Sequence, residues 1–395
     1  MVYFIPLILI LIGIYKHDYL KRRHGKFIIL FLIGISLILI AGFRYRLGAD
    51  TIFYSQYFHK LPPLADLSVK DFENTRFAPG FVIFTSFCKT ISHDIIFFQI
   101  LESFIVTFSV FFFFWKNTKN IFTAILFYYC VLYTDLNMEV MREALAVSIF
   151  LLAWPTLKNG NWFIYLLLIL LASTFHISAI PFLFLPLIFL PGINYFFTFG
   201  KRTLIICGLV LIISIGVRYL FLDFIKAIAV TESMMERATA YSKDNMGGNE
   251  TLNIFGGIRQ IIIYVLYPIL AIYFINKKLN ANLKLESLSI LGMYIGTSSI
   301  AILILIRYNN YLMFSSFALL ADWIFSNIKI NYKKIKLDFI GWICIIIPYF
   351  FFASYTQYNA PLSKNLSVKT YRKYYPYNSV FDREKDQQRE KAIHH

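Results

Sequence analysis

The chain has 395 residues, of which 58% are hydrophobic, 19% are aromatic and only 15% are charged. With a mean hydropathy of +0.63, it is too apolar for a soluble domain of this length. Its net charge of +16 does not indicate a nucleic-acid partner, because the Lys and Arg residues are scattered among short segments instead of forming one stripe. These features predict an all-α polytopic protein embedded in a lipid bilayer.

Apolar runs recur along most of the chain. A helix needs about 20 apolar residues to cross a hydrocarbon core of roughly 30 Å. The runs are continuous rather than alternating, which favours helices over barrel strands. The pattern predicts about twelve spans, at residues 2–15, 27–43, 95–115, 120–135, 141–157, 162–174, 177–191, 203–222, 258–275, 286–306, 308–327 and 338–355.

The basic residues predict the orientation, because loops rich in Lys and Arg stay in the cytoplasm. The first loop contains a single acidic residue, Asp18, and the basic residues Lys16, Lys21, Arg22, Arg23 and Lys26. Alternation then places the N-terminus and two longer loops, about 44–94 and 223–257, outside. We expect a transmembrane catalytic domain at residues 1–355 and a polar, Tyr- and Lys-rich tail at 356–395 without a packed core of its own.

Two apolar segments do not fit the span pattern. Residues 79–91 are short and contain Lys89, so they are compatible with a re-entrant, an interfacial or a spanning helix. Residues 162–190 are too long for one span and short for two. Because polar residues occupy positions 173–176, we expect the chain to bend there, on the outer side.

Two arginines, Arg44 and Arg46, directly follow the apolar run 27–43. A guanidinium group pairs in bidentate fashion with phosphate oxygens and keeps its proton, so it suits a diphosphate leaving group. Together with Arg142, His176 and Arg307, which the topology places on the same side, Arg44 is expected to form one composite site. The alternative for Arg44 and Arg46 is interfacial snorkelling.

Arg142 is expected at the outer start of an apolar helix, beside Glu143, which we include as a substrate-binding candidate. A cation at that depth requires a partner. The alternative to a functional role is a structural ion pair with Glu139, which lies nearly one helical turn earlier.

The sequence RYNNY at 307–311 is expected to form a polar break between two apolar runs. Its rings and amides suit stacking on a sugar or hydrogen bonding to it. An interfacial aromatic belt is the alternative for Tyr308 and Tyr311.

Two residues are candidate general bases. His176 titrates near neutral pH and suits proton transfer, although a histidine that caps a helix is the alternative. Asp50 follows Gly48, which allows a tight turn at that point. Glu102 and Arg218 are secondary candidates, because they are charges inside predicted spans.

The sequence lacks the motifs of several well-known catalytic and metal-binding chemistries. The four cysteines show no pair spacing, so we expect no disulfide and no metal cluster. Motifs for ATP binding, zinc hydrolysis and serine hydrolysis are absent, and the predicted cytoplasmic loops are too short for a nucleotide-binding domain. We expect neither a metal nor a cofactor.

Four motifs together resemble the EpsG-like branch of the Wzy-type O-antigen and exopolysaccharide polymerases: RYRLGAD at 44–50, MREALA at 141–146, FHISAI at 175–180 and RYNNY at 307–311. The resemblance implies a fold similar to the C-type membrane glycosyltransferases, in a bacterial inner membrane with the site facing outward. The chain departs from the family pattern at Thr51, where Tyr is common, and at Ala78, where a Glu-Pro-Gly-like turn is usual. A role for that glutamate is therefore not transferred.

The resemblance also implies a reaction. A glycan on undecaprenyl diphosphate is passed to the terminal sugar of another lipid-linked repeat unit, and a chain-length regulator is a further expected partner. Arg142 and Arg307, with Arg44, would stabilise the diphosphate, while His176 or Asp50 would deprotonate the acceptor, with inversion at the anomeric carbon. An O-antigen ligase and a flippase or transporter of lipid-linked oligosaccharide remain the alternatives.

Overall fold

The computed structural model describes residues 2–48, 50–73, 75–228, 258, 261–266, 268–269, 283–326, 374 and 377–381, with only the backbone for residues 218–228, 283, 303 and 326. All regular elements within these ranges are helices, which confirms the all-α prediction. The chain forms two compact units: unit 1 comprises Met1–Leu183 and Cys344–His395, and unit 2 comprises Phe184–Ile343.

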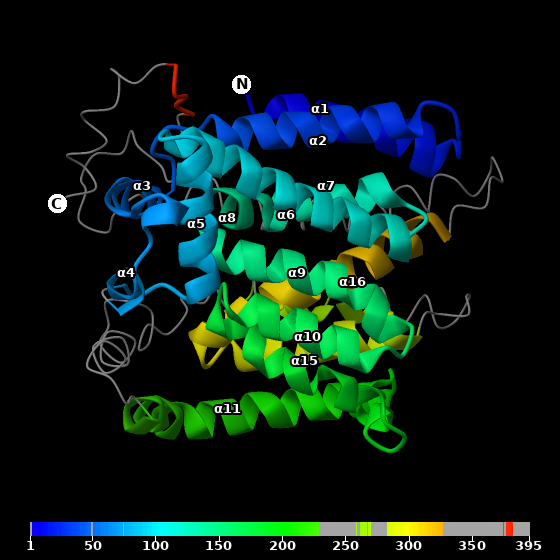
Figure 1. Cartoon of the computed structure of the whole chain (residues 1–395). Coiled ribbons are helices and arrows are strands. Elements are labelled where there is room, and N and C mark those ends of the chain that lie inside the picture. The colour runs from blue at the N-terminus through cyan, green and yellow to red at the C-terminus, as the bar shows by residue number, and fades with distance from the viewer. Residues whose placement is uncertain are drawn as a thin grey trace, which may run out of the picture. The chain divides into compact units, whose positions relative to one another are not determined.

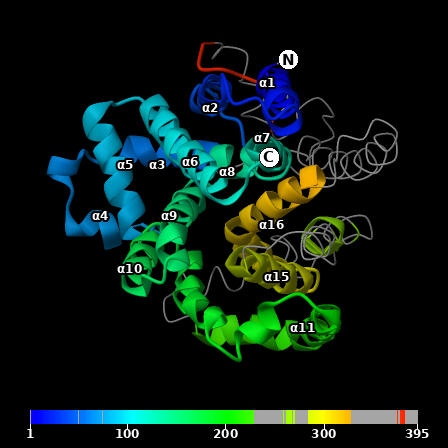
Figure 2. The same ribbon diagram turned by 90° about the vertical axis from the view of Figure 1, so that its right-hand side faces the viewer.

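Long helices lie side by side in unit 1 (Figures 1 and 2). Helix α2 packs against α1 and α6, and α9 packs against α6 and α10. Their bounds are α1 Phe4–Gly13, continued by a π-helix Ile14–Tyr19, α2 Lys26–Gly42, α6 Ile95–Asn117, α7 Ile121–Val131, α8 Tyr133–Met138, α9 Met141–Lys158 and α10 Trp162–Ser173.

One of the described helices, α6, is long and apolar enough to cross a membrane by itself. Shorter apolar helices accompany it: α2, α5 (Pro79–Ile91), α7, α10 and the 3-10 helix Ile177–Phe189. Large apolar side chains such as Phe27 and Phe31 on α2 are exposed, as expected for a surface that faces lipid. The number of spans stays a prediction, and the span predicted at 338–355 lies outside the described residues.

The predicted bend within residues 162–190 is confirmed. Helix α10 ends at Ser173, and a 3-10 helix begins at Ile177. The hydroxyl of Tyr165 donates to the carbonyl of Phe182 at 2.9 Å and joins the two segments.

Two of the predicted runs are not single helices. Residues 120–135 contain the break between α7 and α8, and residues 286–306 contain the end of α15, Leu283–Ser298. The hydroxyls of Ser298 and Ser299 donate to carbonyls of the last turn of α15, a local alternative to continued helix. The chain resumes as a short 3-10 helix, Leu303–Leu305, and then as α16, Ile306–Ser326.

The prediction of a polar break at RYNNY is therefore wrong, because residues 307–311 lie inside the first turns of α16. The break precedes them. In unit 2, α15 packs against both α16 and α11, Lys201–Ile228. Short helices Asn194–Phe197 and Ile262–Leu266 also contact α15.

The predicted outer loop at 44–94 is largely helical. It forms α3 (Thr51–Lys60), a 3-10 helix at Leu64–Asp66, α4 (Val69–Glu73) and α5. These elements lie across one end of the long helices of unit 1 (Figure 1). At 1.5 Å per residue, α5 is about 20 Å long, which is too short to cross a core of roughly 30 Å by itself.

The start of α5 is fixed by a close contact at Gly80. Its N–H donates to the carbonyl of Thr174 at 2.8 Å, where α10 gives way to the next segment. A Cβ at position 80 would lie 2.3 Å from Thr174 Oγ1 and 2.9 Å from Thr174 O. Position 80 of the Pro-Gly turn thus requires glycine, because the backbone of residue 80 contacts the backbone of Thr174 there.

We predict that Gly80→Ala destabilises the protein by about 1–3 kcal/mol, because the added methyl group forces this contact apart. Thermal unfolding of the detergent-solubilised protein measures the effect. The control is Gly208→Ala on α11, where no atom lies within 4 Å of the added carbon and alanine favours the helix. Equal melting temperatures for the two variants would contradict the prediction.

Candidate active site

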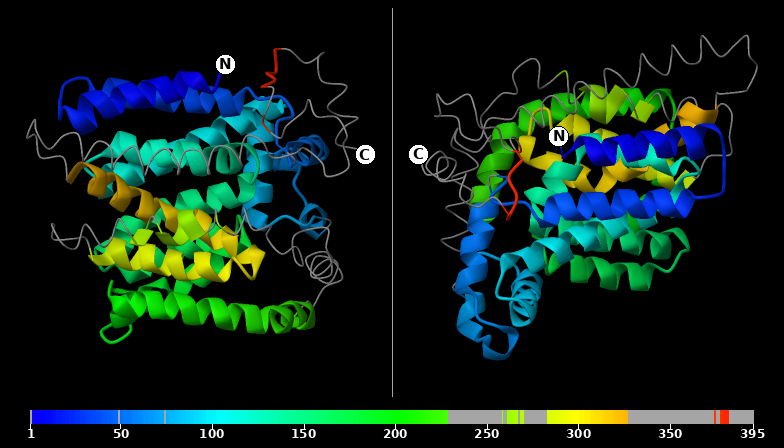
Figure 3. Two further views of the ribbon diagram at one scale, coloured as in Figure 1. Left: turned by 180° about the vertical axis from the view of Figure 1, so that it is seen from behind. Right: turned by 90° about the horizontal axis from the view of Figure 1, so that it is seen from above.

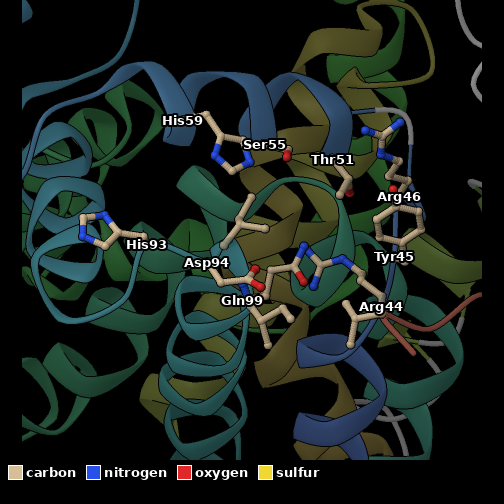
Figure 4. Close-up of a pocket in the computed structure, with 12 residues that line it drawn as sticks. Arg44, Tyr45, Arg46, Thr51, Ser55, His59, His93, Asp94 and Gln99 are labelled. Carbon is tan, nitrogen blue, oxygen red and sulfur yellow. The ribbon is translucent and has the colours of Figure 1, made fainter. Parts of the chain in front are cut away.

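A cavity of about 480 Å³ opens in unit 1 between the turn that follows α2, helix α3 and the start of α6 (Figure 4). Residues four apart on α3, Thr51, Ser55 and His59, form one wall, as expected for one face of a helix. The other lining residues are Arg44, Tyr45, Arg46, His93, Asp94, Ile95, Ile96, Gln99 and Val380.

Arg44 is one of the lining residues of this cavity and is fully buried. Its Nη1 donates to the carbonyl of Ala41, and its side chain points toward Gln99 of α6 (Figure 4). Burial lowers the pKa of Arg44, while the charge of Glu102 raises it. Because a guanidinium keeps its proton in proteins, Arg44 remains a cation at the cavity wall. The snorkelling alternative does not fit Arg44, whose side chain is enclosed by protein.

Glu102 is the partner of Arg44 that the sequence pattern did not assign. It is fully buried in α6, one turn further along the helix than Gln99, and its charge interacts with that of Arg44. Among the described residues, neither carboxylate oxygen of Glu102 has a hydrogen-bond partner. Glu102 therefore acts on Arg44 mainly through its charge. The side chain of Arg218 lies outside the described residues.

We predict that Glu102→Gln destabilises unit 1 by about 3–5 kcal/mol, because it removes a buried negative charge that interacts with the buried Arg44 cation. Thermal unfolding measures this loss. The double variant Glu102→Leu with Arg44→Met removes both charges and should recover most of the stability. If the double variant were less stable than the single one, the charge interaction would not be the cause.

Arg46 and Gly48 shape the turn that carries Arg44. Arg46 has a φ of +53° and places its guanidinium 5.2 Å from the ring centroid of Tyr45. Gly48 has a φ of +92°, and a Cβ there would lie 2.8 Å from the carbonyl oxygen of Met138. The tight turn expected at Gly48 is confirmed. Thr51 closes it, because its hydroxyl donates to the carbonyls of Leu47 and Met138.

The C-terminal segment 377–381 forms another wall of the cavity. Ser379 pairs with Arg44 in an antiparallel bridge, the N–H of Tyr45 donates to Asn378 O at 2.9 Å, and the N–H of Val380 donates to Phe43 O at 3.0 Å. Figure 3 shows this segment in red beside the end of α2. The tail thus binds the backbone of the arginine-bearing turn at Phe43, Arg44 and Tyr45.

Tyrosine side chains anchor the tail to unit 1. The Tyr377 hydroxyl donates to Ile40 O at 2.9 Å. Tyr374 is buried, and its hydroxyl donates to Asp135 Oδ1 at 2.9 Å and to a carboxylate oxygen of Glu139. These contacts place Tyr374 and residues 377–381 at the same end of unit 1 as Arg44, and hence on the same side of any membrane that unit 1 crosses.

Arg142 lies in the first turn of α9, as predicted, but outside the cavity lining. Its Nε donates to the Tyr54 hydroxyl at 3.1 Å, and its guanidinium lies 4.6 Å from the centroid of the Phe77 ring. Within the described ranges, no carboxylate is in salt-bridge contact with Arg142, and Glu139 binds Tyr374 instead. Arg142 and Glu139 therefore do not form the structural ion pair that was the alternative to a functional role. Glu143 is buried in α9.

His176 makes the contacts of the helix-cap alternative. It precedes the 3-10 helix, and its Nδ1 accepts from the Ser178 N–H at 3.3 Å and lies 2.6 Å from Ser178 Oγ. Because Nδ1 accepts, the neutral ring carries its proton on Nε2 and offers a donor there. Asp50 is exposed immediately before α3, and its carbonyl accepts from the N–H of Tyr54.

Some of the RYNNY residues are buried in unit 2 and others are partly exposed. Asn309 and Tyr311 are fully buried, and Asn309 Nδ2 lies 3.1 Å from where a Cβ on Gly296 of α15 would be. Tyr311 would have to become exposed before it could contact a substrate. Arg307 and Tyr308 are half-buried. Because Arg307 belongs to unit 2 and the other candidates to unit 1, the four-residue composite site stays a prediction.

The helical fold with its apolar segments defines a helical membrane protein. A model of the EpsG family matches residues 27–379, and the chain therefore belongs to the EpsG family, as its motifs predicted. Membership indicates a polysaccharide polymerase of glycosyltransferase-like type. The matched range ends at Ser379, so it includes both the Arg44 turn and Ser379, which pairs with Arg44. No curated protein and no solved structure matches the chain.

Proposed function

We propose that the protein is a polysaccharide polymerase that transfers a glycan from undecaprenyl diphosphate to the terminal sugar hydroxyl of another lipid-linked repeat unit. The reaction takes place on the outer face of the bacterial plasma membrane. The observation that carries the proposal is the buried cation Arg44 at the wall of a cavity of about 480 Å³, in a chain of the EpsG family.

The charges in unit 1 suit the leaving group. Arg44 and Arg46 line the cavity, and Arg142 presents a further guanidinium beside α3. As the bond between the anomeric carbon and the phosphate oxygen breaks, the electron pair stays on the diphosphate, whose added charge these cations stabilise. Arg307 and Tyr308 belong to unit 2, and their part in this stabilisation stays a prediction from the sequence.

We assign proton removal to Asp50 rather than to His176. The neutral His176 ring carries its proton on Nε2 as long as Nδ1 accepts from Ser178, so Nε2 cannot accept another. An exposed Asp carries a carboxylate at neutral pH and accepts the proton of the acceptor hydroxyl. The hydroxyl oxygen then attacks the anomeric carbon from the face opposite the diphosphate, which inverts its configuration.

The proposal is tested in cells that produce the glycan. Arg142→Gln should leave single lipid-linked repeats while long chains disappear, because the repeat unit is still made and moved but not joined. Extraction and sizing of lipid-linked glycans measures both species. Lys70→Gln, a change of the same charge on α4, is the control and should leave chain length unchanged.

Two outcomes would assign a different function. Repeat units that accumulate on the inner face of the membrane in the Arg142→Gln cells would indicate a flippase. Normal long chains that fail to reach their final acceptor would indicate a ligase. Normal long chains delivered normally would contradict the role of Arg142.

A further inference from the structure

Helix α3 presents a polar face to the cavity of unit 1. Thr51, Ser55 and His59 line the cavity from this helix, and His93 lines it from the segment before α6. Figure 4 shows the Ser55 hydroxyl and the His59 ring directed from α3 into the space that Arg44 borders from another side. Other residues of α3 pack into the hydrophobic core with α5, so the helix is amphipathic and its polar side faces the cavity.

Both ends of α3 are held by other segments. At its start, the Thr51 hydroxyl donates to the carbonyl of Met138 at 3.1 Å. At its end, Nζ of Lys89 on α5 donates to the carbonyl of Phe58 at 3.0 Å and to that of His59 at 2.7 Å, which caps the last turn. The polar face is therefore fixed before a ligand binds, which lowers the entropy cost of binding.

The polar groups on this face are not used in bonds within the protein. The hydroxyls of Thr85 and Ser109, on other helices of unit 1, donate to the carbonyl four residues earlier. The Ser55 hydroxyl makes no such bond, and in the described part of the chain the rings of His59 and His93 hydrogen-bond to no protein group. Ser55 is half-buried and both histidines are exposed, so all three side chains can reach a ligand in the cavity.

These side chains suit a sugar better than a phosphate. A serine hydroxyl and a neutral imidazole each carry a donor and an acceptor, and a sugar hydroxyl requires both. A diphosphate offers acceptors only, so it suits the guanidinium groups of Arg44 and Arg46 at another wall of the cavity. The cavity thus provides different walls for the two parts of a lipid-linked saccharide.

The position of Asp50 favours the acceptor sugar over the donor sugar. Asp50, to which we assign proton removal, directly precedes α3. At 1.5 Å per residue, Ser55 and His59 lie about 6 Å and about 12 Å beyond Thr51 along the helix axis. A saccharide that lies along this face from the start of α3 brings its terminal hydroxyl to Asp50 and its next sugar to His59.

We propose that the face of α3 that carries Ser55 and His59 forms, with His93, the subsite for the terminal sugars of the acceptor repeat unit. The inference rests on the proposed function and adds these three residues to its site. Because each side chain offers both a donor and an acceptor, the subsite recognises the arrangement of sugar hydroxyls rather than the lipid or its diphosphate.

The subsite is tested by equilibrium binding of the repeat-unit oligosaccharide to the purified full-length protein in nanodiscs. Mild acid releases this probe from the lipid-linked precursor of the producing cells, so it carries neither lipid nor diphosphate. His59→Leu should weaken binding about tenfold and Ser55→Ala about threefold, through the loss of two hydrogen bonds and of one. His59→Gln keeps a donor and an acceptor and should weaken binding less than His59→Leu.

Two controls separate sugar recognition from a general change in the protein. His24→Leu makes the same substitution at an exposed position before α2 and should bind the oligosaccharide as the wild type does. Binding of inorganic diphosphate, the part of the substrate that the probe lacks, should be unchanged in Ser55→Ala and His59→Leu. Thermal unfolding of each variant verifies that the fold is retained.

Three results would overturn the subsite. They are a wild type that does not bind the oligosaccharide, wild-type affinity in both Ser55→Ala and His59→Leu, and an equal loss of inorganic diphosphate binding, which would assign this face to the leaving group. The measurement requires no turnover. If His59→Leu loses oligosaccharide affinity but the wild type forms no polymer, the subsite stands and the polymerase reaction fails. If polymer forms normally and both variants bind normally, the polymerase stands and the subsite fails.

Discussion

Replacing Asp50 by Asn should reduce the rate of glycan transfer by roughly 10²–10⁴-fold, the usual contribution of a general base. The variant keeps the shape of the side chain but cannot accept the proton of the acceptor hydroxyl. Because Asp50 is exposed, the fold should be unaffected. The rate of chain elongation in membrane vesicles supplied with lipid-linked repeats measures the effect.

His176 provides the matched comparison. His176→Asn should retain most of the activity, because Asn also accepts from a backbone N–H at a helix start and can replace the bond to Ser178. His176→Ala loses this acceptor and should cost about 1 kcal/mol of stability. A large loss of rate in His176→Asn, with Asp50→Asn still active, would reverse the assignment of the base.

Ending the chain at residue 373 should abolish long-chain synthesis. The truncation removes the backbone pairing of Ser379 with Arg44, the hydrogen bond from Tyr377 to Ile40 and the Val380 side of the cavity. The turn would then lose the partner that keeps Arg44 in position. Sizing of lipid-linked glycans measures the outcome, as it does for the arginine variants.

The control is a chain that ends after Phe381, which retains all of the described tail contacts and should make long chains. Tyr377→Phe removes a single hydrogen bond and should cost about 1 kcal/mol of stability. Membrane levels and thermal unfolding separate a misplaced Arg44 from general misfolding. Long chains made by the protein truncated at residue 373 would show that the tail is dispensable.

Local features of the fold could be predicted where local sequence determines them. Polar residues at 173–176 interrupt an apolar run, and the bend lies there. Gly48 permits a backbone conformation that other residues rarely adopt, and the turn after α2 uses it. The position of Arg142 in the first turn of α9 also follows from the polar residues that precede it.

Other features depend on contacts between distant segments and have no local signal. The polar composition of RYNNY suggested a break, but α16 buries Asn309 and Tyr311 and keeps the motif helical. The tail is polar and rich in Tyr, yet Tyr377 and Tyr374 donate to acceptors on α2 and α8.

Partners of the charged residues were the hardest to predict. Spacing suggested Glu139 for Arg142, whereas the structure pairs Arg142 with Tyr54 and Phe77 and joins Glu139 to the tail. Glu102 stood out only as a charge within an apolar run, and its relation to Arg44 required the packing of α6 against α2.

The most direct measurement is reconstitution of the purified protein in proteoliposomes with lipid-linked repeat units as the only substrate. We predict longer glycans and the release of one undecaprenyl diphosphate for each new glycosidic bond, with both lost in Asp50→Asn. Movement of repeat units across the bilayer without any release of undecaprenyl diphosphate would contradict the polymerase.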